Sequence, residues 1–208
     1  MLTTTQILAF LFTSIVLTAT PGPDNLMVLS FGISRGRRSG MAFGIGCALG
    51  CFSHTFFAVI GVTALVAASP LAFTIFKLSG GVYLIWLGIQ ALRNAGSTHQ
   101  SLMTANGDSM QRLFIKGLVA NTINPKVALF FLSFLPQFVN PANDDVQLQI
   151  GLLGILFTLQ TVFLFGLLGY FSGSVGAWLN KLPKARLFLD RVAGTIFIAL
   201  GIRMFASR

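Results

Sequence analysis

The sequence predicts an all-helical (all-α) integral membrane protein whose six transmembrane helices form two inverted three-helix repeats. Three observations support this prediction: the apolar composition, six long apolar stretches with basic connections, and proline breaks at matching places in the first and fourth stretches. Apolar residues make up 54% of the 208 residues, charged residues only 9%, and phenylalanine occurs 21 times. A soluble domain of this length would expose much of that surface to water, so the composition indicates a bilayer.

Six stretches approach the roughly 20 apolar residues that a membrane-spanning helix needs. They are residues 7–34, 40–68, 71–92, 117–135, 150–171 and 187–206. The sixth is the weakest, because Asp190, Arg191 and Arg203 flank its purely apolar part, although charges near helix ends can reach the headgroups. We expect one membrane domain over 1–208, with a first repeat over about 1–93, a cytoplasmic loop over about 94–111 and a second repeat over about 112–208.

Ten of the 14 lysines and arginines lie in three alternate connections. They are Arg35, Arg37, Arg38, Arg93, Arg112, Lys116, Lys181, Lys184, Arg186 and Arg191. The connections on the other side, 1–6, 69–70 and 136–149, contain none. Basic residues collect on the cytoplasmic side of membrane proteins, so we expect both termini outside. The net charge of +9 therefore reflects membrane orientation and does not indicate a nucleic-acid partner.

The first apolar stretch is broken by the sequence PGPD at 21–24, and the fourth by INPK at 123–126. When Pro23 is aligned with Pro125, Asp24 falls on Lys126, so each break is followed by one charge. Proline removes a backbone donor and clashes with the preceding turn, which leaves carbonyl groups without helical partners. Such groups are tolerated in a membrane where they line a cavity, and an ionisable residue there indicates function.

A second correspondence links the two halves of the chain. GVYLIWLGI at 81–89 and GTIFIALGI at 194–202 share the pattern G-x-x-x-I-x-L-G-I, one in the third stretch and one in the sixth. Three spans per repeat is an odd number, so the second repeat must be inverted relative to the first. In secondary transporters of this design, the broken helices of the two repeats meet near the membrane midplane and form the substrate site.

Four blocks of the sequence, in this order, resemble the lysine exporter (LysE) superfamily in its homoserine/threonine resistance (RhtB) branch. They are TPGPDN at 20–25, KLSGGVYLIWLGIQALR at 77–93, GLVANTINPKVALFFLSFLPQF at 117–138 and RVAGTIFIALGIR at 191–203. The resemblance covers nearly the whole chain. It implies a multi-pass exporter (efflux protein) in the bacterial inner (plasma) membrane, for amino acids or their small derivatives, driven by the proton gradient. Some relatives carry Asn directly after proline-glycine-proline, where this chain has Asp24.

The candidate substrate-binding residues are those of the two broken segments: Thr20, Pro21, Gly22, Pro23, Asp24, Asn25, Asn121, Asn124, Pro125 and Lys126. A zwitterionic amino acid carries one charge of each sign, as Asp24 and Lys126 do together, and the main-chain N–H groups around Asn25–Leu26 are further candidates for its carboxylate. The alternative is that Asp24 and Lys126 form a purely structural buried ion pair.

Asp24 is the first candidate for proton coupling and His54 the second. No second deep carboxylate is available for a basic side chain, which favours a neutral substrate such as homoserine or threonine. The expected partners are therefore the amino acid, protons and the lipid bilayer. No nucleotide-binding motif and no cofactor is expected. Tyr83, Trp86 and Gln160 are candidates to shape the pocket, although aromatic residues in a span are more often anchors.

Two other functions compete with amino-acid export. Cys47, Cys51 and His54 share one helical face, which is compatible with a heavy-metal cation exporter. The two cysteines also allow a membrane thiol-redox enzyme, although i, i+4 positions in a helix suit a disulfide poorly. Small-residue ridges in this stretch indicate close helix packing, within one chain or in a homodimer, and comprise Gly36, Gly40, Gly44, Gly46 and Gly50.

Overall fold

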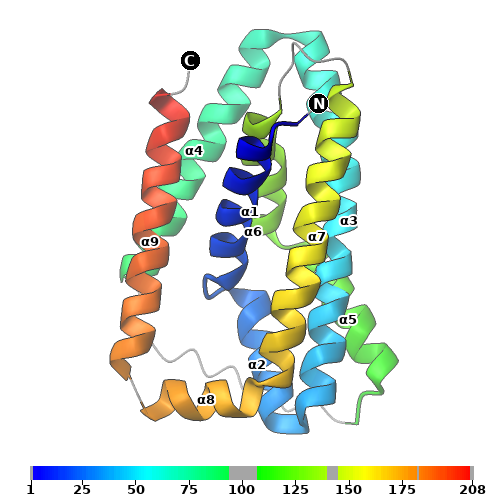
Figure 1. Ribbon diagram of the computed structural model, residues 1–208, viewed down its shortest axis with the longest axis vertical. Coiled ribbons are helices and arrows are strands. Elements are labelled where there is room, and N and C mark those ends of the chain that lie inside the picture. The colour runs from blue at the N-terminus through cyan, green and yellow to red at the C-terminus, as the bar shows by residue number, and fades with distance from the viewer. Residues whose placement is uncertain (1, 94–106, 140–144, 182, 207–208) are drawn as a thin grey trace.

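The computed structural model describes residues 2–93, 107–139, 145–181 and 183–206, and all regular structure in these residues is helical. The elements are α1 (Thr4–Ala19), α2 (Pro23–Arg35), α3 (Arg37–Ala68), α4 (Pro70–Arg93), α5 (Met110–Thr122), α6 (Pro125–Leu129), η1 (Phe130–Phe134), η2 (Leu135–Phe138), α7 (Val146–Tyr170), α8 (Ser172–Lys181) and α9 (Pro183–Ala206). Most of them run along the long axis of the molecule, with the start of α1 and the end of α9 at the same end (Figure 1).

The described residues contain two helical segments that are each long and apolar enough to cross a membrane, Arg37–Gly61 of α3 and Val146–Tyr170 of α7. Two bent pairs reach this length together, which gives up to four candidate spans. The α1–α2 pair bends by 56° and the pair formed by α5 and residues 125–138 by 47°. The 24-residue helices α4 and α9 occupy the third and sixth apolar stretches of the sequence.

Both breaks occur at the prolines that predicted them. After α1 the chain is extended at Thr20 and Gly22, and Pro23 opens α2 at a position where its missing N–H is harmless. The second break has its own cap, because Asn124 Oδ1 accepts from the main-chain N–H of Lys126 over 3.0 Å. The two breaks lie near the middle of the long axis (Figure 1).

Glycines set the packing of α3 against its neighbours. A Cβ at Gly46 would collide with the carbonyl of Phe114 on α5, and one at Gly44 would lie 3.0 Å from the carbonyl of Phe165 on α7. The ridges noted in the sequence therefore pack within one chain. Gly36 is the exception: no atom lies within 4 Å of its Cβ position, and its φ of +88° makes it the turn after α2.

Helices α4 and α9 are antiparallel and meet through their glycines. A Cβ at Gly88 would lie 2.6 Å from the carbonyl oxygen of Gly194, and a Cβ at Gly201 would lie 2.7 Å from that of Gly81. The sequence repeat equates Gly81 with Gly194 and Gly88 with Gly201. The contact of Gly88 with Gly194 in one direction therefore corresponds to the contact of Gly201 with Gly81 when each repeat is replaced by the other.

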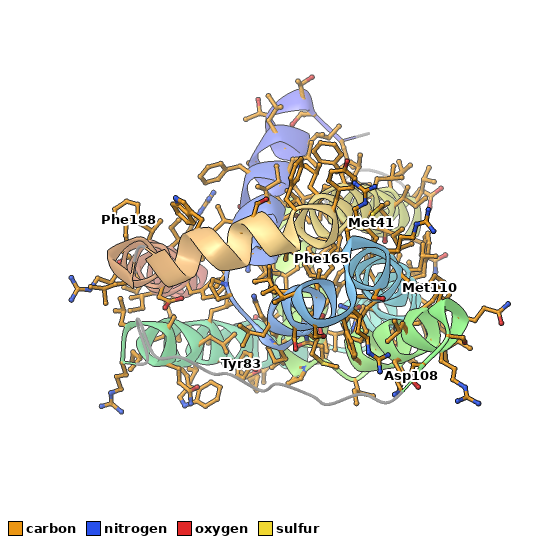
Figure 2. All side chains as sticks on the ribbon, turned by 90° about the horizontal axis from the view of Figure 1, so that it is seen from below. Met41, Tyr83, Asp108, Met110, Phe165 and Phe188 are labelled. Atoms are coloured by element: carbon orange, nitrogen blue, oxygen red, sulfur yellow. The ribbon has the colours of Figure 1, made fainter. Side chains whose placement is uncertain are left out.

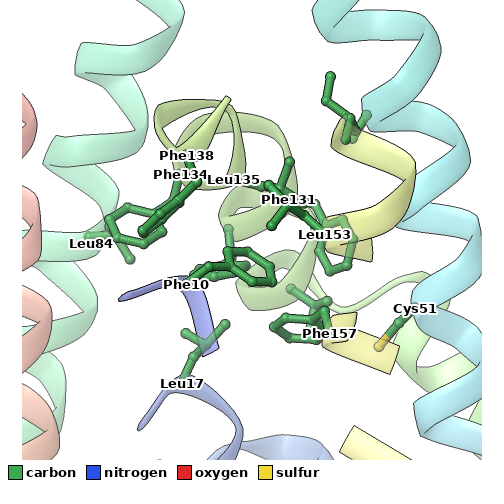
Figure 3. Packing of buried hydrophobic residues seen from close by; sticks show 14 of the residues in the cluster. Phe10, Leu17, Cys51, Leu84, Phe131, Phe134, Leu135, Phe138, Leu153 and Phe157 are labelled. Carbon is green, nitrogen blue, oxygen red and sulfur yellow. The ribbon is translucent and has the colours of Figure 1, made fainter. Parts of the chain in front are cut away.

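A phenylalanine-rich core fills the end of the molecule that holds α1 and η2. Phe10 of α1 lies 5.3 Å from Phe138 and 6.2 Å from Phe130, measured between ring centroids (Figure 3). Phe130 in turn lies 5.3 Å from Phe157 of α7. These contacts hold the second half of the fourth stretch, which continues as the π-helix η1 and the 3-10 helix η2, against both α1 and α7.

Helix α8 is an element that the sequence analysis did not predict. It crosses the lower end of the molecule almost perpendicular to the other helices (Figure 1, Figure 2). A Cβ at Gly32 of α2 would collide with Ser172 of α8, so the two helices touch closely. The boundary of the predicted loop at 94–111 also shifts, because α5 already begins at Met110, while residues 94–106 lie outside the described residues.

Candidate functional site

A cavity of about 20 Å³ lies between the two helix breaks. Its walls come from α1, α2, α3, α5, α6 and α7 and from the break residues between them. They comprise Leu17, Thr18, Gly22, Asp24, Asn25, Cys51, Asn121, Asn124, Lys126, Val127, Phe157, Thr161 and Phe165. Six of the ten predicted substrate residues are among them, and both charged ones are included. A volume of this size holds about one water molecule, so an amino acid requires the walls to separate.

The first break leaves main-chain groups open to the cavity. Asn25 Nδ2 donates to the carbonyl of Thr18 over 2.7 Å, and Leu26 N donates to the carbonyl of Gly22 over 3.0 Å. Leu26 is therefore not a free donor, contrary to expectation. Gly22 caps α2 without a side chain, and the N–H groups of Asp24 and Asn25 have no acceptor among the described residues. The positive end of the α2 dipole thus faces the cavity.

Asn121 joins the carboxylate of the first break to the second break. Its Nδ2 donates to Asp24 Oδ2 over 2.8 Å, and Asp24 is only 4% exposed. Its Oδ1 lies 3.5 Å from the thiol of Cys51. Its main-chain carbonyl lies 2.8 Å from His54 Nε2, and since a carbonyl only accepts, His54 must carry its proton on this nitrogen. His54 does not line the cavity but is linked to Asp24 through Asn121.

Lys126 reaches across to the carbonyl group that the first break leaves free. Its Nζ donates to Thr20 O over 2.9 Å and lies 5.7 Å from the ring centroid of Phe197, within the range of a cation–π contact. Ion pairs within 4.0 Å were found elsewhere in the described part of the chain, but none joins Lys126 to Asp24. In this conformation the two residues therefore do not form the structural ion pair that was the alternative interpretation.

The other predicted residues hold the breaks open without lining the cavity. Pro23 and Pro125 are exposed at the first positions of α2 and α6, and Pro21 is exposed in the break between α1 and α2. Thr20 acts through its main chain, and its hydroxyl donates to the carbonyl of Val16 over 2.6 Å.

The aromatic residues proposed for the pocket lie elsewhere. Tyr83 and Trp86 contact each other on α4 at 5.4 Å between ring centroids, and neither lines the cavity.

On α7 the sequence indicated Gln160 for the pocket, but not the three residues of this helix that line the cavity. Phe157, Thr161 and Phe165 face the cavity from this helix. In a membrane helix both the lipid face and the packed face are apolar, so no amphipathic pattern marks the side that turns inward. Polar residues such as Gln160 and Thr161 were the only available signal.

The cysteines do not form a metal site with His54. No group of three His, Cys, Asp or Glu residues that could hold a metal ion occurs among the described residues. Cys47 and Cys51 are free thiols with 0% exposure, so a redox partner could not reach them in this conformation. The geometry thus supports neither the metal exporter nor the thiol-redox enzyme.

Comparison with known proteins identifies the family. The pattern of the LysE type translocator family matches residues 15–208. The homoserine/homoserine lactone efflux protein of Salmonella typhimurium is 32% identical over 202 residues, which cover 96% of each chain. The threonine efflux protein of the same organism is 31% identical, covering 93% of this chain and 94% of its own. The leucine efflux protein of an Enterobacter species is 27% identical, covering 88% and 87%.

No solved structure gives a significant match to the chain. The family match includes both broken segments and the repeated glycine pattern, and it confirms the resemblance seen in the sequence. The chain therefore belongs to the LysE type translocator family and is a membrane transporter, not an enzyme.

Proposed function

We propose that this chain exports a neutral amino acid across the bacterial inner membrane by proton-coupled secondary transport. One observation carries the proposal: Asp24 and Lys126 line the same cavity without pairing with each other, so it offers one charge of each sign. The three efflux relatives compared above are named for homoserine and its lactone, threonine and leucine, and these three amino acids have uncharged side chains.

The two ends of the substrate bind to different walls in this proposal. The α-ammonium group binds Asp24, the only acidic residue among those that line the cavity. The carboxylate binds Lys126 together with the free N–H groups of Asp24 and Asn25 at the start of the 13-residue helix α2. Gly22 makes room for this arrangement, because a Cβ there would lie 3.2 Å from Lys126 Nζ. Substrate then takes the place of Thr20 as the partner of Lys126.

A basic substrate would need a second carboxylate for its side chain. Asp24 is occupied by the α-ammonium group, and the remaining lining residues are neutral apart from Lys126. An unpaired ammonium group in a desolvated site is costly. The cavity therefore favours neutral amino acids over lysine or arginine.

Transport requires the two breaks to separate, since the cavity holds about one water molecule. We propose that 1–208 form a single membrane domain of six spans, with repeats over about 1–93 and 112–208 that move against each other. The exchanged glycine contacts of the antiparallel helices α4 and α9 support an inverted relation of the repeats. Both termini lie outside in this arrangement, opposite the basic connections.

Proton coupling is assigned to Asp24, with His54 as its neighbour in the network. Asn121 contacts both residues, through its side chain to Asp24 and through its main chain to His54. Protonation of Asp24 would remove the charge that holds the substrate ammonium group. Binding of a proton and binding of substrate are therefore mutually exclusive, as proton-for-substrate exchange requires.

Purified protein in proteoliposomes tests this function directly. Labelled neutral and basic amino acids are loaded, and their flux is followed with and without an imposed pH gradient. We expect concentrative transport of at least one neutral amino acid, and its collapse when an uncoupler removes the gradient. Uphill transport that persists without a proton gradient, or transport of lysine alone, would contradict the proposal.

A further inference from the structure

Gln160 of α7 contacts the polar wall of the cavity through two threonines that line it. Its Nε2 donates to Thr18 Oγ1 over 2.9 Å and to Thr161 Oγ1 over 2.8 Å. Both threonines line the cavity, Thr18 from α1 and Thr161 from α7. One carboxamide group therefore bridges the two hydroxyl groups of this wall.

The amide oxygen of Gln160 is buried and has no hydrogen-bond partner among the described residues. Buried acceptors in native proteins are nearly always paired, so an unpaired one calls for an explanation. The oxygen and nitrogen of a carboxamide are bonded to the same carbon atom. Oε1 consequently belongs to the same amide group whose Nε2 contacts the two hydroxyl groups of the cavity wall.

Thr18 supplies the complementary group. Its hydroxyl oxygen accepts from Gln160, and no acceptor for its own proton is found in the described part of the chain. The hydroxyl of Thr161 differs, because it donates to the carbonyl of Phe157 over 2.8 Å. The Thr18 hydroxyl thus keeps a free donor, and the amide group that contacts it keeps a free acceptor. A hydroxyl group, which both donates and accepts, satisfies both.

The position of this pair suits the side chain of a bound amino acid. Thr18 adjoins the charged end of the cavity, because Asn25, the neighbour of Asp24, donates to its carbonyl over 2.7 Å. We infer that Gln160, together with Thr18, determines specificity and favours amino acids with a side-chain hydroxyl group over isosteres with a methyl group. This inference rests on the proposed export of neutral amino acids.

The test compares threonine with valine and homoserine with norvaline, pairs that differ by hydroxyl against methyl. Initial transport rates are measured in proteoliposomes at equal, subsaturating concentrations. We expect the wild type to transport the hydroxylated member about tenfold faster or more. The methyl member would leave the buried polar groups of Gln160 and Thr18 unpaired. Gln160→Met, of similar length without the amide, should bring this ratio close to one, mainly by slowing the hydroxylated substrate.

A matched control is Gln137→Met, because Gln137 donates its amide to the carbonyl of Ser133 over 3.2 Å and does not line the cavity. Its ratio should equal that of the wild type. Equal wild-type rates for both members of each pair, or an unchanged ratio in Gln160→Met, would overturn the role of Gln160 while leaving neutral amino-acid export intact. Absence of export for every neutral amino acid would overturn the proposed function and this inference together.

A binding measurement covers the case in which Gln160→Met does not fold. Purified wild-type protein in detergent is heated with threonine or with valine at the same concentration. Threonine should raise the unfolding midpoint more than valine, since only threonine pairs with Gln160 and Thr18. Equal shifts from the two ligands would overturn the inference.

Discussion

Asn121 Nδ2 donates a hydrogen bond of 2.8 Å to Asp24 Oδ2, and this bond joins the two helix breaks across 97 positions of the chain. Both side chains are buried, with 1% of Asn121 and 4% of Asp24 exposed. The bond therefore fixes the carboxylate of the first repeat to the last turn of α5 in the second. A movement that separates the two breaks must therefore break this hydrogen bond, unless Asp24 and Asn121 move together.

Replacing Asn121 by the similarly sized leucine should weaken both folding and transport. The change leaves the buried carboxylate of Asp24 without its partner, at an expected cost of about 2–3 kcal/mol in the free energy of unfolding. Efflux should fall about tenfold or more. Thermal unfolding in detergent and proteoliposome transport measure the two effects. Gln111→Leu on the exposed side of α5 is the control and should change neither.

Gly22→Ala should impair transport with little effect on stability. The new methyl group would lie 3.2 Å from Lys126 Nζ, whereas the extended φ of −156° at this position suits any residue. We expect a several-fold increase in the substrate concentration for half-maximal transport, because Lys126 is displaced from the carboxylate site. Gly61→Ala on α3, where nothing lies within 4 Å, should transport normally. Normal transport by Gly22→Ala would argue against Lys126 as a substrate ligand.

Asp108 should make a pH-dependent contribution to stability at the end of the molecule where α5 begins (Figure 2). The hydrogen bond of 2.7 Å from Lys116 holds the pKa of Asp108 below its ordinary value of 3.8. A lowered pKa means that the stabilisation is present above the ordinary value and is lost as the pH falls through the folded-state value.

Asp108→Asn should therefore lower the unfolding midpoint slightly at pH 7 and by less near pH 3, because the stabilisation fades as the pH falls below 3.8. The effect should be small because the Lys116 side chain is half exposed, with 52% of its surface accessible. The midpoint is followed by fluorescence in detergent across this pH range. A mutant that is less stable than the wild type by the same amount at both pH values would contradict the assignment.

Replacing both cysteines by alanine should leave most of the amino-acid efflux intact. Cys47 and Cys51 are buried, and the thiol of Cys51 contributes only a weak contact of 3.5 Å to Asn121. A metal exporter or a thiol-redox enzyme would lose its function altogether. The comparison is the transport rate per folded protein, with the Cys47→Ala and Cys51→Ala single variants alongside.

The sequence predicted both helix breaks, because the main-chain nitrogen of Pro23 or Pro125 cannot donate a helical hydrogen bond. This holds whatever the tertiary structure is. The inverted repeat also predicted that Asp24 and Lys126 lie at the same site, and both residues line the cavity. The sequence could not predict their partners, since the reach of a lysine side chain depends on which carbonyl the other repeat leaves free. Lys126 bonds the carbonyl of Thr20 in the first repeat.

Helix α8 escaped prediction for a different reason. Its sequence, SGSVGAWLNK, contains two glycines and two serines, which are typical of a loop. Its position depends on the close contact between Gly32 of α2 and Ser172, a tertiary interaction that local propensity does not reveal. Similarly, the sequence of a break in a membrane helix does not show which neighbouring helix will close the cavity. In this protein that helix is α7.

Efflux by Asp24→Asn, Lys126→Met and the double variant tests the central claim most directly. Asn keeps hydrogen-bonding capacity at position 24 and loses the titratable charge, so Asp24→Asn should reach the membrane, remain folded and fail to concentrate substrate. Lys126→Met should also fail, because the carboxylate loses its cation. Since the structure pairs neither charge with the other, removing both should not restore function. A double variant that exports at the wild-type rate would contradict the account.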